Sequence, residues 1–319
     1  LEYANLSNRF KEMKYYPSYI STFYKIGEHT LGTELLKNYE DPRSVKAAPD
    51  YELLNILNYL YLDNPEIFAS TLDSFIEANP SNMSLRNIQA FVSNNAVLAD
   101  LRKDGLQIIK DHLAEKKNYS YSAYYILDYA VFHYFPDGSA ISITHQISRI
   151  MNKEGKNLLG EVYLPENAII TKLRTIKHDT LDIVTPENIS HKTSITMPKL
   201  DDGDFIEVEY YIAEAPVSEF DNSYYVPTWF FKVIDAPLLH SEFIIEYPLS
   251  AKPEVEIHNA NPLIECQKIS EYERCKYRLD MQLPPLREPF SPNSYNFLPM
   301  VQIAHKSSIE RILSSLNSK

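Results

Sequence analysis

The chain is poor in glycine and cysteine, with only 7 and 2 of them among its 319 residues. Glycine lets backbone N–H groups approach a phosphate closely, so this scarcity leaves little material for phosphate-binding loops. Gly27 and Gly32 have the spacing of such a loop, but Thr33 and Glu34 follow where Lys and then Ser or Thr are required. We therefore expect no nucleotide or other cofactor. No HExxH, CxxC or EF-hand pattern is present either, so we expect no metal.

The chain also lacks an excess of positive charge and long apolar runs. Its formal net charge is −12, whereas proteins that wrap nucleic acid need clustered Lys and Arg. No segment is long and apolar enough to span a bilayer or to act as a signal segment. We therefore expect neither a nucleic-acid partner nor a membrane span, and we interpret the start at Leu1 as that of a cut or processed chain.

What is present is the composition of a soluble globular protein, with 44% hydrophobic and 23% charged residues. The length suggests two domains. The 24 tyrosines suit half-buried sheet faces, because the ring can pack while the hydroxyl stays in water.

Residues 1–126 are predicted to be a helical domain. From Asp50, two amphipathic segments are each followed by Asn-Pro, and Asn64-Pro65 supplies a cap and a first-turn proline for the second segment. Two further segments, 85–92 and 97–113, have the same character. Paired helices with tight turns are typical of a repeat array of the tetratricopeptide kind; the alternative is an irregular helical domain.

Residues 127–289 are predicted to be an antiparallel β-sandwich, because the hydrophobic period there changes from helical to alternating. The first hairpin turns at Pro136-Asp137-Gly138, and its second strand places Ile141, Ile143 and Ile147 on one face. In a later strand Ile206 and Val208 are expected inside, with Glu207 and Glu209 pointing outward. Further strands are expected at 168–177, 192–197, 229–234, 242–247, 254–258 and 277–283. The fold class is thus α+β with more than one domain.

Residues 290–319 are predicted to be a proline-rich linker and the start of a new helix. Pro284, Pro285, Pro289 and Pro292 favour an extended backbone, and 307–316 has the pattern of a helix.

The strand region resembles a known bacterial family, the domain of unknown function numbered 3857. The segments are NKEGKNLLGEVYLPENAIITKLRTIKHDT, then MPKLDDGDFIEVEYYIAEAP, then VPTWFF, in the order found in that family. His178 and Thr180 depart from it, since Pro and Gly are usual there. The resemblance covers residues 127–289. It implies a sandwich module of exported proteins, often behind helical repeats and ahead of a transglutaminase-like core whose Cys, His and Asp would lie beyond Lys319.

The two cysteines are candidates for a disulfide. If Ser270-Glu271 is a two-residue turn, Ile269 pairs with Tyr272 and Cys266 falls opposite Cys275, on a non-hydrogen-bonded pair. The same register places Lys268 opposite Glu273, a favourable charge pair. The alternative is two free, half-buried thiols. Neither cysteine starts a helix, so neither is expected to be an activated nucleophile.

Three other groups of residues could carry function. His145 lies on the isoleucine face of its strand, where a hydrogen-bonded core histidine is the more common case. Asp201, Asp202 and Asp204 around Gly203 could hold a cation, but an acidic turn is the simpler interpretation. Tyr224, Tyr225 and Trp229 belong to the densest aromatic cluster and are candidates for binding a protein or peptide partner.

We therefore predict a non-catalytic structural or interaction module of a larger exported protein, periplasmic or at the cell surface. It would position or recruit substrate for a downstream transglutaminase-like core in the same polypeptide. The alternative is the regulatory half of a transglutaminase-like peptidase or cross-linking enzyme. An independent carbohydrate-binding sandwich is a third and weaker alternative.

Overall fold

The computed structural model describes residues 16–37, 50–187, 189, 192–215, 227–231, 236–251, 253–284 and 297–304. The chain divides into two compact units, Leu1–Asp100 (unit 1) and Leu101–Lys319 (unit 2). The sequence placed the division at residue 126. The 101–126 segment instead belongs to unit 2, because its helix packs on the sheet of that unit.

Unit 1 contains five α-helices in its described residues: α2 (Tyr16–Lys25), α3 (His29–Lys37), α5 (Asp50–Asp63), α6 (Pro65–Ala78) and α7 (Met83–Ser93). Asn64 caps α6 through a side-chain bond from Ile67 N, with Pro65 in the first turn as predicted. Asn82 caps α7 in the same way. Their apolar faces form one core around Leu53, Ile56, Leu57, Leu72 and Phe75. The two amphipathic segments that follow Asp50 are therefore confirmed as helices; the repeat array stays a prediction.

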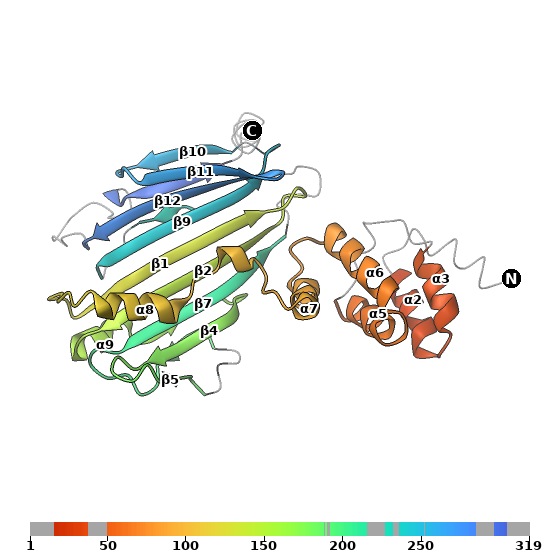
Figure 1. The fold of residues 1–319 in the computed structure, drawn as a ribbon, viewed down its shortest axis with the longest axis horizontal. Helices are drawn as coiled ribbons and strands as arrows, with labels where there is room; N and C mark the ends of the chain where they lie inside the picture. The colour runs from red at the N-terminus through yellow and green to blue at the C-terminus, as the bar shows by residue number, and fades with distance from the viewer. Residues whose placement is uncertain are drawn as a thin grey trace, which may run out of the picture. The chain divides into compact units, whose positions relative to one another are not determined.

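Unit 2 is built on an eight-stranded sheet with the order β11-β12-β9-β1-β2-β7-β4-β5 (Figure 1). Its strands are β1 (Ala123–Tyr134), β2 (Ala140–Ile150), β4 (Ile169–Ile176), β5 (Ile183–Val184), β7 (Phe205–Glu214), β9 (Leu238–Pro248), β11 (Leu263–Ile269) and β12 (Tyr272–Gln282). Most neighbours are antiparallel, but β1 and β9 are parallel. The sheet is therefore mixed, where the sequence predicted an antiparallel one.

Two small sheets cover one face of this large sheet. The first is β10 (Glu254–His258), β13 (Met300–Ala304) and β8 (Trp229–Phe230), and the second is β3 (Glu161–Tyr163) with β6 (Ser194–Thr196). Phe132, Phe243 and Tyr277 of the large sheet pack against the first small sheet, where they meet Val301 of β13 and Phe231, the residue after β8. Leu173, Ile206 and Val208 of the large sheet pack against the second small sheet, where they meet Ile195 of β6. We call this the apolar face.

β13 corrects the prediction of a linker at 290–319, because residues 300–304 pair with β10 and β8 as the middle strand of a sheet. Val301 and Ile303 alternate into the core and supply the reason. The helix predicted at 307–316 lies outside the described residues. So do Pro285, Pro289 and Pro292.

The opposite face of the large sheet is crossed by α8 (Gly105–Ala114), as Figure 1 shows. The short 3₁₀ helix η1 (Ala99–Leu101) precedes it, and α9 (Lys153–Leu159) follows β2. Asp104 caps α8 by accepting bonds from Leu106 N and Gln107 N. The prediction of one helix over 97–113 is thus right for its second half only.

Among the described residues no helix is long and apolar enough to cross a membrane.

Candidate functional site

The face beneath α8 carries three ionisable side chains with no solvent exposure. His145 of β2, Glu207 and Glu209 of β7 are each 0% exposed. The sequence predicted both glutamates outward, on the solvent side of β7, and this is wrong. The alternation of β7 is as predicted, but both faces of the sheet are covered, so its charged face is buried as well.

Cations from the neighbouring strand β4 neutralise the two glutamates. Arg174 Nε donates to Glu207 Oε2 at 2.7 Å, and Lys172 Nζ lies 3.0 Å from Glu209 Oε2 and 3.3 Å from Glu207 Oε1. His145 Nε2 is hydrogen-bonded to Glu207 Oε1 at 2.9 Å, whereas its Nδ1 lies 3.4 Å from Glu209 Oε2 without forming a hydrogen bond. His145 is therefore a hydrogen-bonded core residue, as expected. We call His145, Glu207, Glu209, Lys172, Arg174 and Arg102 the buried charge cluster.

The cluster holds its carboxylates in the ionised form. Burial alone would raise the pKa of Glu207, but the hydrogen bonds from His145 and Arg174 and the charge of Lys172 outweigh it and lower this pKa to about 2. Burial also opposes ionisation of Glu209, and hydrogen bonds from Thr171 and Lys172 bring its pKa below the ordinary value. Both glutamates are thus fixed anions.

The segment before α8 is anchored to the sheet through the same cluster. Arg102 forms an ion pair with Glu209, and Lys103 Nζ lies 2.9 Å from Glu242 Oε1 on β9. Tyr129 of β1 donates from its hydroxyl to the Leu101 carbonyl at 2.6 Å. At the start of α8, Gly105 lies directly on the Glu207 side chain. The cluster therefore clamps α8 onto the sheet.

Further along the same face, two more buried acids are paired. Glu242 accepts from His240 Nε2 at 3.3 Å; burial opposes its ionisation, yet His240 and Lys103 lower its pKa to about 2. Glu246 lies 2.9 Å from His133 Nδ1 and pairs with Arg274. The charged face thus continues across β9 and β12.

Asp128 of β1 is a different case, because no cation among the described residues pairs with it directly. Its carboxylate accepts from Gln146 Nε2 at 2.8 Å and from Ser241 Oγ at 3.0 Å. Burial raises its pKa to about 6, since two neutral donors do not offset the loss of water. Asp128 is therefore a buried acid whose pKa is close to neutrality.

The acidic turn at 201–204 is closed by cations of the protein itself. Asp204 is 0% exposed and accepts from Lys177 and from the backbone and ring nitrogens of His178. Lys177 also pairs with Asp201, and Gly203 has φ +95°. The turn interpretation therefore holds. No group of three or more His, Cys, Asp or Glu with metal-site geometry occurs among the described residues.

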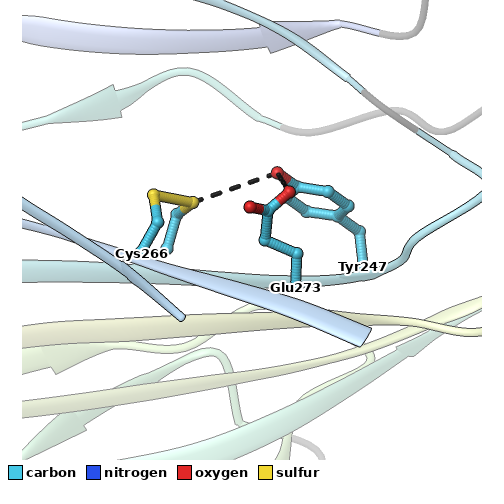
Figure 2. The surroundings of a disulfide bond; sticks show 4 residues. Tyr247, Cys266 and Glu273 are labelled. Carbon is cyan, nitrogen blue, oxygen red and sulfur yellow. Dashed lines mark hydrogen bonds between the residues drawn. A yellow bond between two sulfur atoms is a disulfide. The ribbon is translucent and has the colours of Figure 1, made fainter. Parts of the chain in front are cut away.

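The cysteine hairpin has the predicted register. β11 and β12 pair Ile269 with Tyr272, Lys268 with Glu273 and Cys266 with Cys275 around the Ser270-Glu271 turn, and Ser270 has φ +53°. The structure joins Cys266 to Cys275 by a disulfide, with Cα atoms 4.1 Å apart. Figure 2 shows the bond beside Tyr247, whose hydroxyl lies 3.9 Å from Cys275 Sγ and donates to Glu273 at 2.8 Å.

The aromatic candidates are only partly described. Tyr224 and Tyr225 lie outside the described residues. Trp229 stacks on Phe243, with ring centroids 5.5 Å apart and planes at 14°, and is half-buried against the core of the apolar face. Part of the Trp229 side chain thus belongs to the core, and its role in binding a partner stays a prediction.

Sequence reasoning missed the buried charge cluster, although a signal existed. The β4 motif Lys-x-Arg has the same two-residue spacing as the β7 motif Glu-x-Glu, and these charges face one another in the observed register. Oppositely charged residues at matching spacing on two strands indicate a paired, covered face. Sequence alone did not reveal that α8 would cover it.

No protein-family model and no curated protein matches the chain. Among solved structures, the chain is similar to a protein of Parabacteroides distasonis ATCC 8503 described as a "putative protease", with 15% identity and a TM-score of 0.49. The match covers 58% of this chain and 40% of that one, so the chain spans less than half of that protein's length. At this level the likeness carries no information on function.

Proposed function

We propose that the chain is a non-catalytic structural or interaction module of a larger exported bacterial protein. It positions or recruits substrate for a downstream transglutaminase-like core. The observation that carries the proposal is that the buried glutamates of unit 2 form ion pairs within the fold. Glu207, Glu209 and Glu242 are ionised and bound to cations of the same chain, so they hold the fold together. A general acid or base needs a pKa near the working pH, which Glu207 and Glu242 do not have. Asp128 has a pKa of about 6, but it is buried and its carboxylate is bound by Gln146 and Ser241, so it does not face a substrate surface.

The cysteines support the same proposal. Thiolate chemistry needs a free, activated sulfur, and the only two cysteines of the chain are joined to each other. Disulfides form and persist in oxidising compartments, which supports export to the periplasm or the cell surface.

The test is an assay of the isolated chain for peptide hydrolysis and for transfer of an acyl group from a glutamine-containing peptide to an amine. We expect no turnover above buffer. Turnover that persists through purification and is abolished by Cys266→Ala would overturn the proposal.

The alternative is that the chain is the regulatory half of a transglutaminase-like peptidase or cross-linking enzyme. The two functions differ in kinetics. In a longer polypeptide with a Cys-His-Asp core beyond Lys319, loss of a recruiting module raises KM and leaves kcat unchanged, because only substrate binding is lost. Loss of a regulatory module changes kcat. Deletion of residues 101–304 from that polypeptide, with kcat and KM measured separately, distinguishes them.

A further inference from the structure

The two edges of the large sheet in unit 2 are unequal. At one edge β5 has only two residues, which is a common protection against pairing with other chains. At the other edge β11 has seven, without proline, glycine or a register shift. All seven are exposed, and no strand of the described residues pairs with its outer side. A long, regular edge of this kind is a template for another strand.

The disulfide identifies which backbone groups of β11 point outward. Cα atoms 4.1 Å apart place Cys266 and Cys275 on a non-hydrogen-bonded pair. The N–H and C=O groups of Cys266 therefore point away from β12. By the alternation of an antiparallel pair, those of Ile264 and Lys268 do the same. Three residues thus offer donors and acceptors along the outer edge.

The side chains of β11 are also unusually apolar for an edge. Leu263, Ile264 and Ile269 are 55%, 47% and 37% exposed. Glu265 and Lys268 are the only charged residues of the strand. Edge strands of monomers are commonly protected by charges on both faces, so this composition favours a partner strand.

We propose that two copies of this chain join edge to edge through antiparallel β11 strands. The two-fold axis that relates them is perpendicular to the sheet and passes midway between the two Cys266 residues, which lie opposite one another. In this register Leu263 faces Ile269 of the other copy, Ile264 faces Lys268 and Glu265 faces Gln267. Each pair occurs twice by symmetry. The apolar residues cover one another, the Gln267 amide can donate to the Glu265 carboxylate, and the Lys268 stem can pack on Ile264.

The neighbouring registers are worse. A two-fold axis through Glu265 places Glu265 opposite its own symmetry mate, a like-charge pair. An axis through Gln267 places Leu263 opposite Glu271 and Glu265 opposite Ile269. An axis between residues would pair side chains from opposite faces, which the period of a strand forbids. When two copies of the sequence Leu-Ile-Glu-Cys-Gln-Lys-Ile run antiparallel with Cys266 opposite Cys266, the side chains that face one another are compatible. This match favours a second copy of the chain as the partner of the β11 edge.

The dimer should be weak and salt-dependent. A seven-residue strand edge buries less than a standard interface, so concentrations from about 5 to about 500 µM should be covered. Two copies of a chain with a net charge of −12 repel one another, and salt screens that repulsion. We therefore expect association to tighten with added NaCl.

Sedimentation velocity of the whole chain, with and without Ile264→Lys, tests the proposal. The introduced ammonium group would face Lys268 of the other copy at two symmetric places, so the dissociation constant should rise by about tenfold. Ile183→Lys on β5 is the matched control: Ile183 is 45% exposed, at the opposite edge of the same sheet, and this change should leave the constant unaltered. Adding Lys268→Glu to Ile264→Lys should restore association.

A second variant guards against loss of folding in the first. Ile264→Glu places an acid opposite Lys268 and should tighten the dimer severalfold despite the added negative charge. A chain that stays monomeric at every concentration and salt overturns the proposal. So does a dimer that Ile264→Lys and Ile264→Glu leave unchanged, or one that Ile183→Lys weakens equally.

Discussion

Gly105, the first residue of α8, lies so close to Glu207 that a side chain at position 105 would overlap the Glu207 carboxylate. The absence of a Cβ lets the helix begin directly on the buried acid. The N-terminus of a helix favours a nearby negative charge, so Glu207 is stabilised by α8 as well as by Arg174 and Lys172. The contact couples the helix to the charge cluster.

Gly105→Ala should therefore destabilise unit 2. Helix propensity alone predicts a gain of up to about 1 kcal/mol, because alanine is the better helix former. The overlap with Glu207 should cost about 1–3 kcal/mol and decide the sign. Urea unfolding of both proteins measures the difference. In a Glu207→Ala background the overlap is gone, so there the same change should become neutral or stabilising. A gain in both backgrounds would contradict the contact.

The sequence could predict much of the local structure of unit 2, because local signals determine it. The two-residue turn at Ser270-Glu271 sets the register of β11 and β12 by counting. The Pro136-Asp137-Gly138 turn does the same for β1 and β2, with Gly138 at φ +83°. The Asn64 cap and Pro65 mark the start of α6 in unit 1 in the same way. Each needs only a few adjacent residues.

What could not be predicted depends on segments far apart in the chain. Glu207 and Glu209 are buried because α8, about 100 residues earlier, covers their face. The parallel pairing of β1 with β9 joins residues more than 100 positions apart. β13 is a strand because β10 and β8 lie on either side of it. A local pattern gives the alternation of a strand but not what covers each face.

Acid should destabilise the chain through Glu207 and Glu242. Both have a folded-state pKa of about 2, below the ordinary 4.5, so their contribution is present above pH 4.5 and is lost as pH falls towards 2. Each could contribute about 3 kcal/mol over that range. Unfolding free energies measured from pH 6 to pH 2 should show the loss. Glu207→Gln should flatten the curve; an unchanged slope in that variant would contradict the assignment.

Asp128 should act in the opposite direction. Its folded-state pKa of about 6 exceeds the ordinary 3.8, so its contribution is full below pH 3.8 and is lost as pH rises through 6. Asp128→Asn removes the buried charge and can still accept from Gln146 and donate to Ser241. The variant should gain about 3 kcal/mol over the wild type between pH 4 and pH 8. Parallel stability curves for the two proteins would show that Asp128 is not protonated in the fold.

The disulfide prediction is tested by mass spectrometry of protein prepared under oxidising conditions. The unreduced chain should be lighter than the reduced chain by two hydrogens, with the peptides that contain Cys266 and Cys275 linked. Because the closed loop is short, reduction should cost on the order of 2–3 kcal/mol. A Cys266→Ser, Cys275→Ser variant should show no response to reductant. Two freely alkylated thiols would contradict both the bond and the support it gives to export.

The sharpest test of the buried charge cluster is Glu207→Gln. The variant keeps the shape of the side chain but removes its charge. Lys172 then loses one of its two partner carboxylates, and Arg174 loses the carboxylate that it contacts, in a face closed to water. Breaking a buried pair from one side typically costs about 3–5 kcal/mol, whereas an exposed pair contributes about 1 kcal/mol or less. Glu256→Gln provides the matched control, because Glu256 is 70% exposed beside His258. Chemical unfolding should therefore separate the two variants by several kcal/mol, and hydrogen exchange of the α8 amides should quicken in Glu207→Gln alone. Equal small losses in both variants would mean that α8 is held by its apolar contacts and that the cluster does not clamp it.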